Sequence, residues 1–229
     1  MVEVYGREIC EKSFEEANKF VRFANSLGEK PLLFGGWAVW HYAPYAGSKD
    51  VDFVVSDEKL DALIDFLVSQ GYGQREARLF KEDIFFDLYS ESEEIGDEGK
   101  KFALARLYEG AQDVYLKHYS GAAQRVEILL PTLSRLLYSK ISALAGRNVA
   151  KDRGDVIALL LKAAPEEIGE LNVLLSSLSS SSQREKELRE RLVTLRNDEA
   201  SLAIVTNPTR KNLNKLNAAL KTLKPKLSS

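Results

Sequence analysis

The chain has 229 residues, of which 45% are hydrophobic and 29% charged, with a formal net charge of −2. This length predicts one sizeable packed domain with a smaller one beside it. The single cysteine, Cys10, excludes an intramolecular disulfide framework and a cysteine-cluster zinc site. The N-terminus is too polar for a secretory signal, and no apolar run approaches the roughly 20 residues of a membrane span, so we expect a cytoplasmic protein with no membrane partner.

Helices and strands alternate in the first part of the chain. Apolar residues at helical spacing predict a helix over residues 13–27, with Ser13 as its N-cap. A short apolar run at 31–34 predicts a buried strand that ends at Gly35-Gly36, and a short helix follows over 37–42. β-branched and aromatic residues predict the next strand, Asp50–Val55.

Further short elements follow up to residue 130. We expect a helix to about Gln70, capped by Ser56 or Asp57, and then a hairpin formed by residues 79–80 and 84–89. Strands are predicted at 103–107, 113–117 and 126–130, the last ended by Pro131.

The pattern becomes helical after Pro131. Helices are predicted over 132–145, 151–164, 165–178, 183–205 and 209–223, with a serine-rich joint at 176–182. We therefore expect an α+β domain with a mixed sheet and flanking helices at 1–130, and an all-helical domain at 131–229. The helical domain divides into closing helices (131–178) and a basic helical tail (183–229).

Two aspartates in the strand Asp50–Val55 are candidate metal ligands. Residues two apart in a strand share a face, so Asp50 and Asp52 point the same way while Val51 and Phe53 point into a core. Mg²⁺ binds one or two carboxylates and completes its shell with water and substrate phosphates. Sites that transfer phosphoryl groups often hold two such ions, and a third carboxylate normally completes them.

Asp87 is the best candidate for that third carboxylate. It lies in the apolar run Ile84-Phe85-Phe86-Asp87-Leu88-Tyr89, where a lone acid is expensive to bury unless a metal or another cation meets it. Asp83 is the alternative, although it lies nearer a turn.

The glycine pair is a candidate phosphate-binding turn. Gly35 and Gly36 have no Cβ, so the backbone can approach a ligand closely, and the helix that follows points free N–H groups at the same place. Ser48 is either a further phosphate contact through its hydroxyl or a simple loop residue.

This arrangement resembles the nucleotidyltransferase superfamily that includes DNA polymerase beta. The motif of that family is an apolar strand, Gly-Gly or Gly-Ser, a spacer of about a dozen residues, then acid-x-acid, with a third acid on a later strand. The resemblance implies a nucleotidyltransferase catalytic domain with Asp50, Asp52 and Asp87 as catalytic residues and ligands of two Mg²⁺ or Mn²⁺ ions. It also implies transfer of a nucleoside monophosphate from a nucleoside triphosphate to a hydroxyl of RNA, a protein or a small molecule, with release of pyrophosphate.

The helical region resembles the AbiEii-type subgroup, the toxin components of toxin–antitoxin systems. The resemblance is carried by the strand-Pro at Pro131, by Lys140, and by the run Lys151-Asp152-Arg153-Gly154-Asp155. It implies that Lys140 reaches the triphosphate, that Asp155 positions it or supports the catalytic acids, and that an antitoxin is a partner. Lys140 as an exposed helix residue and Asp155 as a helix-start acid remain alternatives.

The tail and the overall function each leave two interpretations. From Thr206 to Ser229 there are six basic residues and no acidic one. They form either a solvated helix face or a contact with the phosphate backbone of an RNA acceptor. The alternative to an enzyme is a non-catalytic nucleotide-binding or protein-interaction module on the same fold.

Overall fold

The computed structural model describes residues 5–75, 78–95, 102–117, 119, 123–147, 149–177 and 190–223. These residues belong to two compact units. We call the unit that ends at Thr132 the sheet unit and the unit that starts at Leu133 the helical unit, and describe each by itself.

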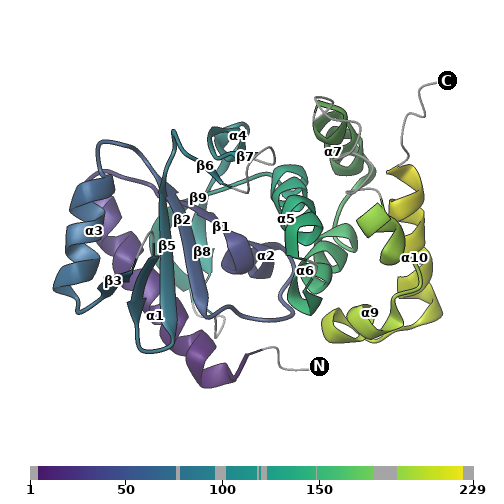
Figure 1. The fold of residues 1–229 in the computed structure, drawn as a ribbon, viewed down its shortest axis with the longest axis horizontal. Coiled ribbons are helices and arrows are strands. Elements are labelled where there is room, and N and C mark those ends of the chain that lie inside the picture. Colours follow the sequence, from purple (N-terminus) through teal and green to yellow (C-terminus); the bar gives the residue numbers. More distant parts are fainter. Residues whose placement is uncertain are drawn as a thin grey trace. The chain divides into compact units, whose positions relative to one another are not determined.

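A seven-stranded mixed sheet forms the centre of the sheet unit (Figure 1). Its order is β3-β4-β5-β2-β1-β9-β8, and the pairs β2–β5 and β1–β9 are parallel while the other pairs are antiparallel. The strands are β1 (Leu32–Phe34), β2 (Asp50–Val55), β3 (Gly73–Arg75), β4 (Arg78–Lys81), β5 (Ile84–Ser90), β8 (Gln112–Lys117) and β9 (Ala123–Leu130). A small second sheet pairs β6 (Glu94–Ile95) with β7 (Phe102–Ala103).

Aromatic side chains join one face of this sheet to α1 (Arg7–Ser26). Phe20 of α1 is completely buried, and its ring centroid lies 5.0 Å from Phe53 of β2 and 5.5 Å from Phe86 of β5. Burying such a side chain stabilises the fold by about 1.5–3 kcal/mol. Phe23 stacks at 4.1 Å on Phe66 of α3 (Leu60–Ser69), so α3 lies beside α1. Because side chains alternate along a strand, the residues next to Phe53 and Phe86 face the opposite side of the sheet.

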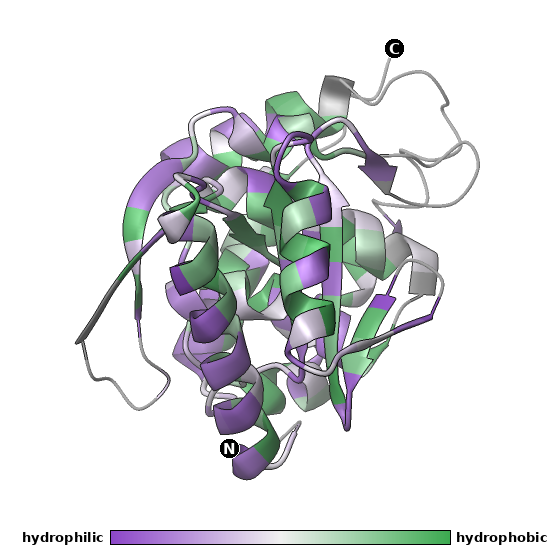
Figure 2. Ribbon diagram, turned by 90° about the vertical axis from the view of Figure 1, so that its left-hand side faces the viewer, coloured by the Kyte–Doolittle hydropathy of each residue, from purple (hydrophilic) through white to green (hydrophobic). Residues whose placement is uncertain are grey.

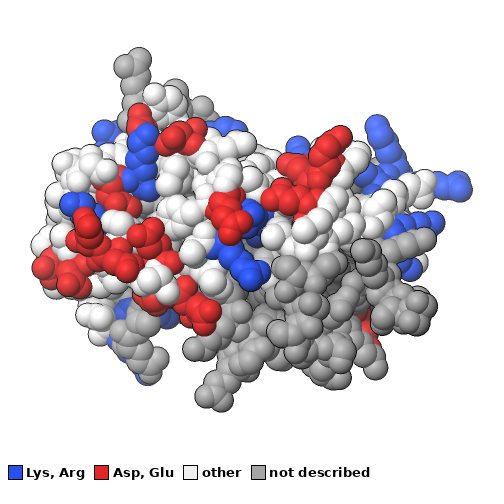
Figure 3. Space-filling view, turned by 90° about the horizontal axis from the view of Figure 1, so that it is seen from above, with Lys and Arg blue, Asp and Glu red and all other residues white. Residues whose placement is uncertain are grey.

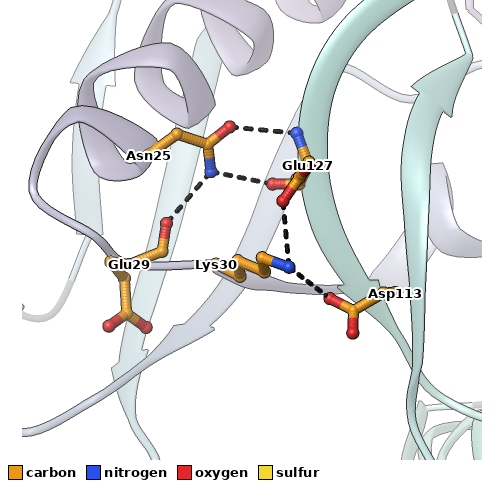
Figure 4. A network of polar contacts seen from close by, with 5 residues as sticks. All are labelled: Asn25, Glu29, Lys30, Asp113 and Glu127. Atoms are coloured by element: carbon orange, nitrogen blue, oxygen red, sulfur yellow. Dashed lines mark hydrogen bonds and ion pairs between the residues drawn. The ribbon is translucent and has the colours of Figure 1, made fainter.

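A polar network fixes the end of α1 to the sheet (Figure 4). The side-chain amide of Asn25 donates to the carbonyl of Glu127 at 2.9 Å and accepts from the N–H of Glu127 at 2.9 Å. Lys30 forms ion pairs of 2.9 Å with both Asp113 and Glu127, which belong to β8 and β9. The Asn25 amide therefore bonds to β9 in the way that a neighbouring strand would.

The helical unit is built from α5 (Leu133–Arg147), α6 (Ala150–Leu160), α7 (Pro165–Ser177), α9 (Glu199–Val205) and α10 (Arg210–Thr222). α5 packs against α6 and α7, and α6 packs against α9 and α10. In the sheet unit, the helices nearest the viewer in Figure 2, which is seen from the side of α3, carry both hydrophilic and hydrophobic residues, as expected for helices with one buried face.

Side-chain caps and cross-links define the ends of the last helices. Asp198 accepts a hydrogen bond from the N–H of Ser201 at the start of α9, and Arg153 of α6 reaches Ser201 at 3.0 Å. Thr209 caps α10, and the Lys215 ammonium donates to the carbonyl of Leu161 at 2.5 Å, just beyond the end of α6. In the part of the chain that the structure describes, no helix combines the length and apolar character needed to cross a membrane.

Acidic side chains gather on the surface of the sheet unit around α3, at the left of Figure 3. The exposed acids around α3 include Asp57, Glu58, Asp61 and Asp65.

The sequence predicts most strands correctly, but two of the predicted N-caps are wrong. α1 begins at Arg7, and Ser13 is buried within it; its hydroxyl donates to the carbonyl of Ser48 at 2.5 Å. α3 begins at Leu60, since the Ser56 hydroxyl donates to Glu29 and Asp57 accepts from Ser90. Tertiary partners thus take the side chains that a local pattern would assign to caps.

Three other predictions differ from the structure. The short helix begins at Gly35 rather than at residue 37. Residues 103–107 are not a strand, because β7 ends at Ala103 and α4 occupies Ala105–Tyr108. The predicted helix 183–205 is interrupted between residues 195 and 198, where Asn197 has a φ of 58° and Asp198 starts α9. Residues 178–189, which include most of the serine-rich stretch, lie outside the described residues.

Candidate active site

A sharp turn from β1 into α2 (Gly35–Tyr42) forms one wall of the candidate site. Gly35 has a φ of +66°, in the left-handed region that favours glycine. A Cβ atom on Gly35 would lie 1.8 Å from Oδ2 of Asp52. No side chain can replace glycine here unless the Asp52 carboxylate moves, so the carboxylate and the first turn of α2 are in direct contact.

Asp50 and Asp52 lie on the face of β2 that is turned away from α1. Both are partly exposed, whereas Val51 and Phe53 between and beyond them are completely buried. Asp52 also pairs in register with Phe34, the last residue of β1 before the turn. The strand therefore presents both carboxylates on one side, and the glycine turn adjoins the second of them.

Asp87 lies beside Asp52 on the neighbouring strand. The two are direct partners in the parallel pair β2–β5, in which strands lie about 4.8 Å apart. Paired residues of adjacent strands face the same side, and Asp87 is only 7% exposed. The sheet thus brings the three predicted acids, Asp50, Asp52 and Asp87, to one face; Asp83 lies outside the strands, in the turn between β4 and β5.

Arg78 binds Asp87, a contact that the sequence analysis missed. Nε of Arg78 lies 2.6 Å from one carboxylate oxygen of Asp87, and a terminal nitrogen lies 2.6 Å from the other. This two-bond geometry is among the strongest that a carboxylate and a cation form. The sequence contains the information to predict this contact. A tight turn at residues 82–83 places Arg78 directly opposite Asp87 in the antiparallel pair β4–β5.

The charges of all three aspartates act on Arg78. The hydrogen bonds to Asp87 raise the pKa of the Arg78 guanidinium, and the negative charges of Asp87, Asp50 and Asp52 add to this. Burial raises the pKa of the Tyr89 hydroxyl, with a further rise from the charges of Asp87 and Asp52. The three carboxylates and Arg78 therefore form one electrostatic group.

A second cation stands close to this group. The Lys49 ammonium lies 5.2 Å from the centre of the Phe85 ring, and the Arg78 guanidinium lies 5.1 Å from the same ring. Phe85 pairs in register with Asp50. Lys49 is hence a positively charged neighbour of the acidic face. The sequence analysis predicted the acidic face but not the role of Lys49.

Ser48 belongs to a tightly held loop. It is only 2% exposed, and its carbonyl accepts the hydrogen bond from Ser13. Ser13 in turn accepts a hydrogen bond of 3.0 Å from the indole of Trp37 in α2. The bulky Trp37 next to the glycines therefore ties α2 to the loop before β2.

Lys140 and Asp155 form a buried ion pair in the helical unit. Their charged atoms lie 2.8 Å apart, and Lys151 also reaches Asp155 at 3.2 Å. Asp155 is 1% exposed and Lys140 7%. Lys140 is therefore not the exposed helix residue that was one alternative, and Asp155 holds its ammonium in place within this unit.

The three carboxylates of the sheet unit differ in the partners they have for a divalent ion to replace. Asp50 and Asp52 supply oxygen donors beside a turn from which the Gly35 position excludes any side chain, and Mg²⁺ needs only one or two carboxylates besides water and phosphate. Both oxygens of Asp87, by contrast, are bonded to Arg78. Among the described residues, no group of three or more His, Cys, Asp or Glu side chains is arranged to hold a metal ion.

Comparisons with known proteins bear on the fold alone. No family model and no curated protein sequence matches the chain. Among solved structures, an antigenic nucleotidyltransferase-like protein from Paracoccidioides brasiliensis superposes with a TM-score of 0.53 at 16% identity, over 88% of this chain and 96% of that one. Two structures of the antibiotic-resistance factor ANT(2'')-Ia follow. The solution structure has a TM-score of 0.43 at 13% identity, over 84% of this chain and 95% of that one. The crystal structure with adenylyl-2''-tobramycin has a TM-score of 0.44 at 10% identity, over 80% of this chain and 98% of that one. The chain therefore has an α+β fold with a mixed sheet similar to that of nucleotidyltransferase-like proteins.

Proposed function

We propose that this protein is a metal-dependent nucleotidyltransferase that moves a nucleoside monophosphate from a nucleoside triphosphate to an acceptor hydroxyl. The observation that carries the proposal is the contact between Asp52 and Gly35, with Asp50 and Asp87 on the same face of the sheet. It joins the turn that we predict to bind phosphate to a carboxylate cluster, the two parts that such a reaction needs. The likeness in fold to a nucleotidyltransferase-like protein supports it.

The reaction breaks a phosphoanhydride bond and forms a phosphoester bond. The acceptor oxygen bonds to the α-phosphorus, the bond from the α-phosphorus to the bridging oxygen of the β-phosphate breaks, and pyrophosphate leaves while the hydroxyl proton passes to water. A divalent ion on Asp50 and Asp52 would supply charge neutralisation for the phosphates. The backbone N–H groups at the start of α2 bind phosphate oxygens, and Asp87 orients the acceptor.

Lys140 and Asp155 enter the proposal as the nucleotide-binding residues that the sequence resemblance implies. Within the helical unit, Asp155 orients the Lys140 ammonium through the ion pair of 2.8 Å.

The acceptor in this proposal is RNA. Exposed basic residues of α10, Arg210, Lys211 and Lys221, can contact its phosphate backbone, whereas the Lys215 ammonium is bonded to Leu161. An RNA contact of this kind predicts binding that weakens steeply with salt. A role as the toxin of a toxin–antitoxin pair, with an antitoxin partner, remains the prediction drawn from the sequence resemblance.

A labelling experiment tests the proposal. The purified chain is incubated with total cellular RNA, Mg²⁺ or Mn²⁺, and each of the four triphosphates labelled at the α-phosphate. We expect label on RNA from at least one triphosphate, and its loss in Asp50→Asn and Asp52→Asn. The control is Asp65→Asn, an exposed acid on α3. Label that persists in the two site variants would remove these residues from the mechanism.

One observation favours the alternative, a non-catalytic nucleotide-binding module. The bonds from Arg78 occupy both oxygens of Asp87, the residue expected to serve the acceptor. The module predicts that triphosphates with Mg²⁺ raise the melting temperature while no label is transferred to any acceptor.

A further inference from the structure

We propose that Arg78 takes the place of the second metal ion, so that the site binds a single divalent ion on Asp50 and Asp52. This inference rests on the proposed function and specifies its metal content. It concerns a residue of β4 that no sequence motif singled out.

Arg78 already occupies the carboxylate oxygens that a second metal ion would need. The Arg78 guanidinium bonds to both oxygens of Asp87 at 2.6 Å, and these are the atoms that a metal ion would need. An arginine keeps its charge under all ordinary conditions and matches a carboxylate with two parallel bonds. Asp87 is therefore already neutralised before any ion enters.

The strand pairing places Arg78 within the carboxylate cluster. Arg78 and Asp87 are direct partners across the antiparallel pair β4–β5, and the Arg78 side chain also lies against the Phe85 ring. Asp87 on the adjacent strand and the Phe85 ring thus contact one side of the guanidinium, while 49% of the Arg78 side chain is exposed. The charges of Asp50 and Asp52 act on it as well, which puts it within the same cluster.

The charges of the cluster also favour a single divalent ion. The three aspartates carry three negative charges, and Arg78 and the nearby Lys49 ammonium bring two positive charges to the same face of the sheet. A second divalent ion would have to displace Arg78 or sit beside it, where two cations repel each other. One divalent ion with these two side chains therefore balances the three carboxylates, and it leaves one positive charge for the phosphates of a bound triphosphate.

The test counts bound ions. Mn²⁺ binding to the full chain is measured by electron paramagnetic resonance, alone and with the α,β-methylene analogues of the four triphosphates. Ions still bound by the double variant Asp50→Asn, Asp52→Asn are subtracted, because they belong elsewhere. We expect one Mn²⁺ per chain in the wild type and two in Arg78→Met, since Asp87 is then released.

Two further variants separate the role of Arg78 from a general change of charge. Arg75→Met removes an exposed arginine on the neighbouring strand, paired in register with Arg78, and should leave one Mn²⁺. Arg78→Met combined with Asp87→Asn should return the count from two to one. Mn²⁺ should also raise the melting temperature of Arg78→Met more than that of the wild type, because buried Asp87 then lacks its arginine.

The outcomes distinguish this inference from the proposed function. Two ions in the wild type, or one ion in Arg78→Met, would overturn the inference and leave the transferase proposal standing. A wild type that binds no ion at Asp50 and Asp52, and transfers no label, would overturn both.

Discussion

The Asp52 carboxylate occupies the space into which a side chain at position 35 would project, with an oxygen 1.8 Å from the place of the missing Cβ. Residues 35 and 52 belong to different elements, a helix start and a strand, and 16 residues separate them along the chain. One glycine therefore serves two purposes: it permits the left-handed turn, and it makes room for an acid of the candidate site.

Gly35→Ala should lose more than the ordinary cost of a left-handed alanine. The Cβ would push the Asp52 carboxylate out of position, so we expect both a lower free energy of unfolding and loss of Mg²⁺-dependent triphosphate binding. Urea unfolding and a melting-temperature shift with triphosphate measure the two effects.

Gly28→Ala is the matched control for this prediction. Gly28 has a φ of +76°, but a Cβ there would meet no atom within 4 Å. The left-handed conformation alone should cost about 1–2 kcal/mol, and triphosphate binding should stay at the wild-type level. Equal behaviour of the two variants would show that the contact with Asp52 has no energetic consequence.

The sequence predicts the strands of the site well because their signal is local. The alternation of acid and apolar residues in Asp50–Val55 assigns both the strand and its two faces, and the structure agrees on each. The hairpin and the strand that carry Asp87 follow from similar local patterns.

What the sequence does not predict depends on contacts between distant segments. Ser13 has the residue type and position of a helix cap, yet it lies inside α1 because Ser48 and Trp37 supply its hydrogen bonds. To predict the bond between Arg78 and Asp87, one must assign both strands and also the register in which they pair. Local propensity predicts neither the position of Ser13 nor this bond, since each depends on which strand or helix becomes a neighbour.

Asn25→Ala should destabilise the sheet unit although Asn25 is remote from the proposed chemistry. The variant leaves the N–H and the carbonyl of Glu127 without their amide partner at a partly buried place, which costs about 1–3 kcal/mol. Lys30→Ala removes the exposed ion pairs of the same network and should cost less than about 1 kcal/mol. Urea unfolding followed by tryptophan fluorescence compares them, and a larger loss in Lys30→Ala would contradict this ranking.

His41 should make the stability depend on pH below neutrality. Burial in α2 lowers the pKa of its imidazole, and the charge of Lys117 lowers it further. The unfolded chain, with a pKa near the usual value of about 6.5, therefore binds a proton at a higher pH than the folded protein does. The contribution of the neutral His41 side chain to the free energy of unfolding is complete above the unfolded pKa. It is lost as the pH falls from there toward the lower pKa of the folded protein.

The measurement for His41 is a comparison of slopes. Between pH 7 and pH 5, the free energy of unfolding of the wild type should fall more steeply than that of His41→Gln, by no more than about 1.4 kcal/mol per pH unit. Carboxylates contribute equally to both proteins, so the difference isolates the imidazole. Parallel slopes would mean that folding does not perturb His41.

Asp155→Asn should destabilise the helical unit strongly, because it leaves the buried Lys140 ammonium without its counter-charge. Removal of one partner from a buried ion pair costs about 3–5 kcal/mol. Lys151→Met is the control, since it removes the longer contact of 3.2 Å and leaves the pair of Lys140 and Asp155 intact. Both tryptophans, Trp37 and Trp40, lie in α2 of the sheet unit, so their fluorescence reports that unit, while circular dichroism follows the helices of both units. We expect Asp155→Asn to lower the circular-dichroism midpoint in urea far more than Lys151→Met does; equal midpoints would show that Asp155 does not hold the lysine in the folded protein.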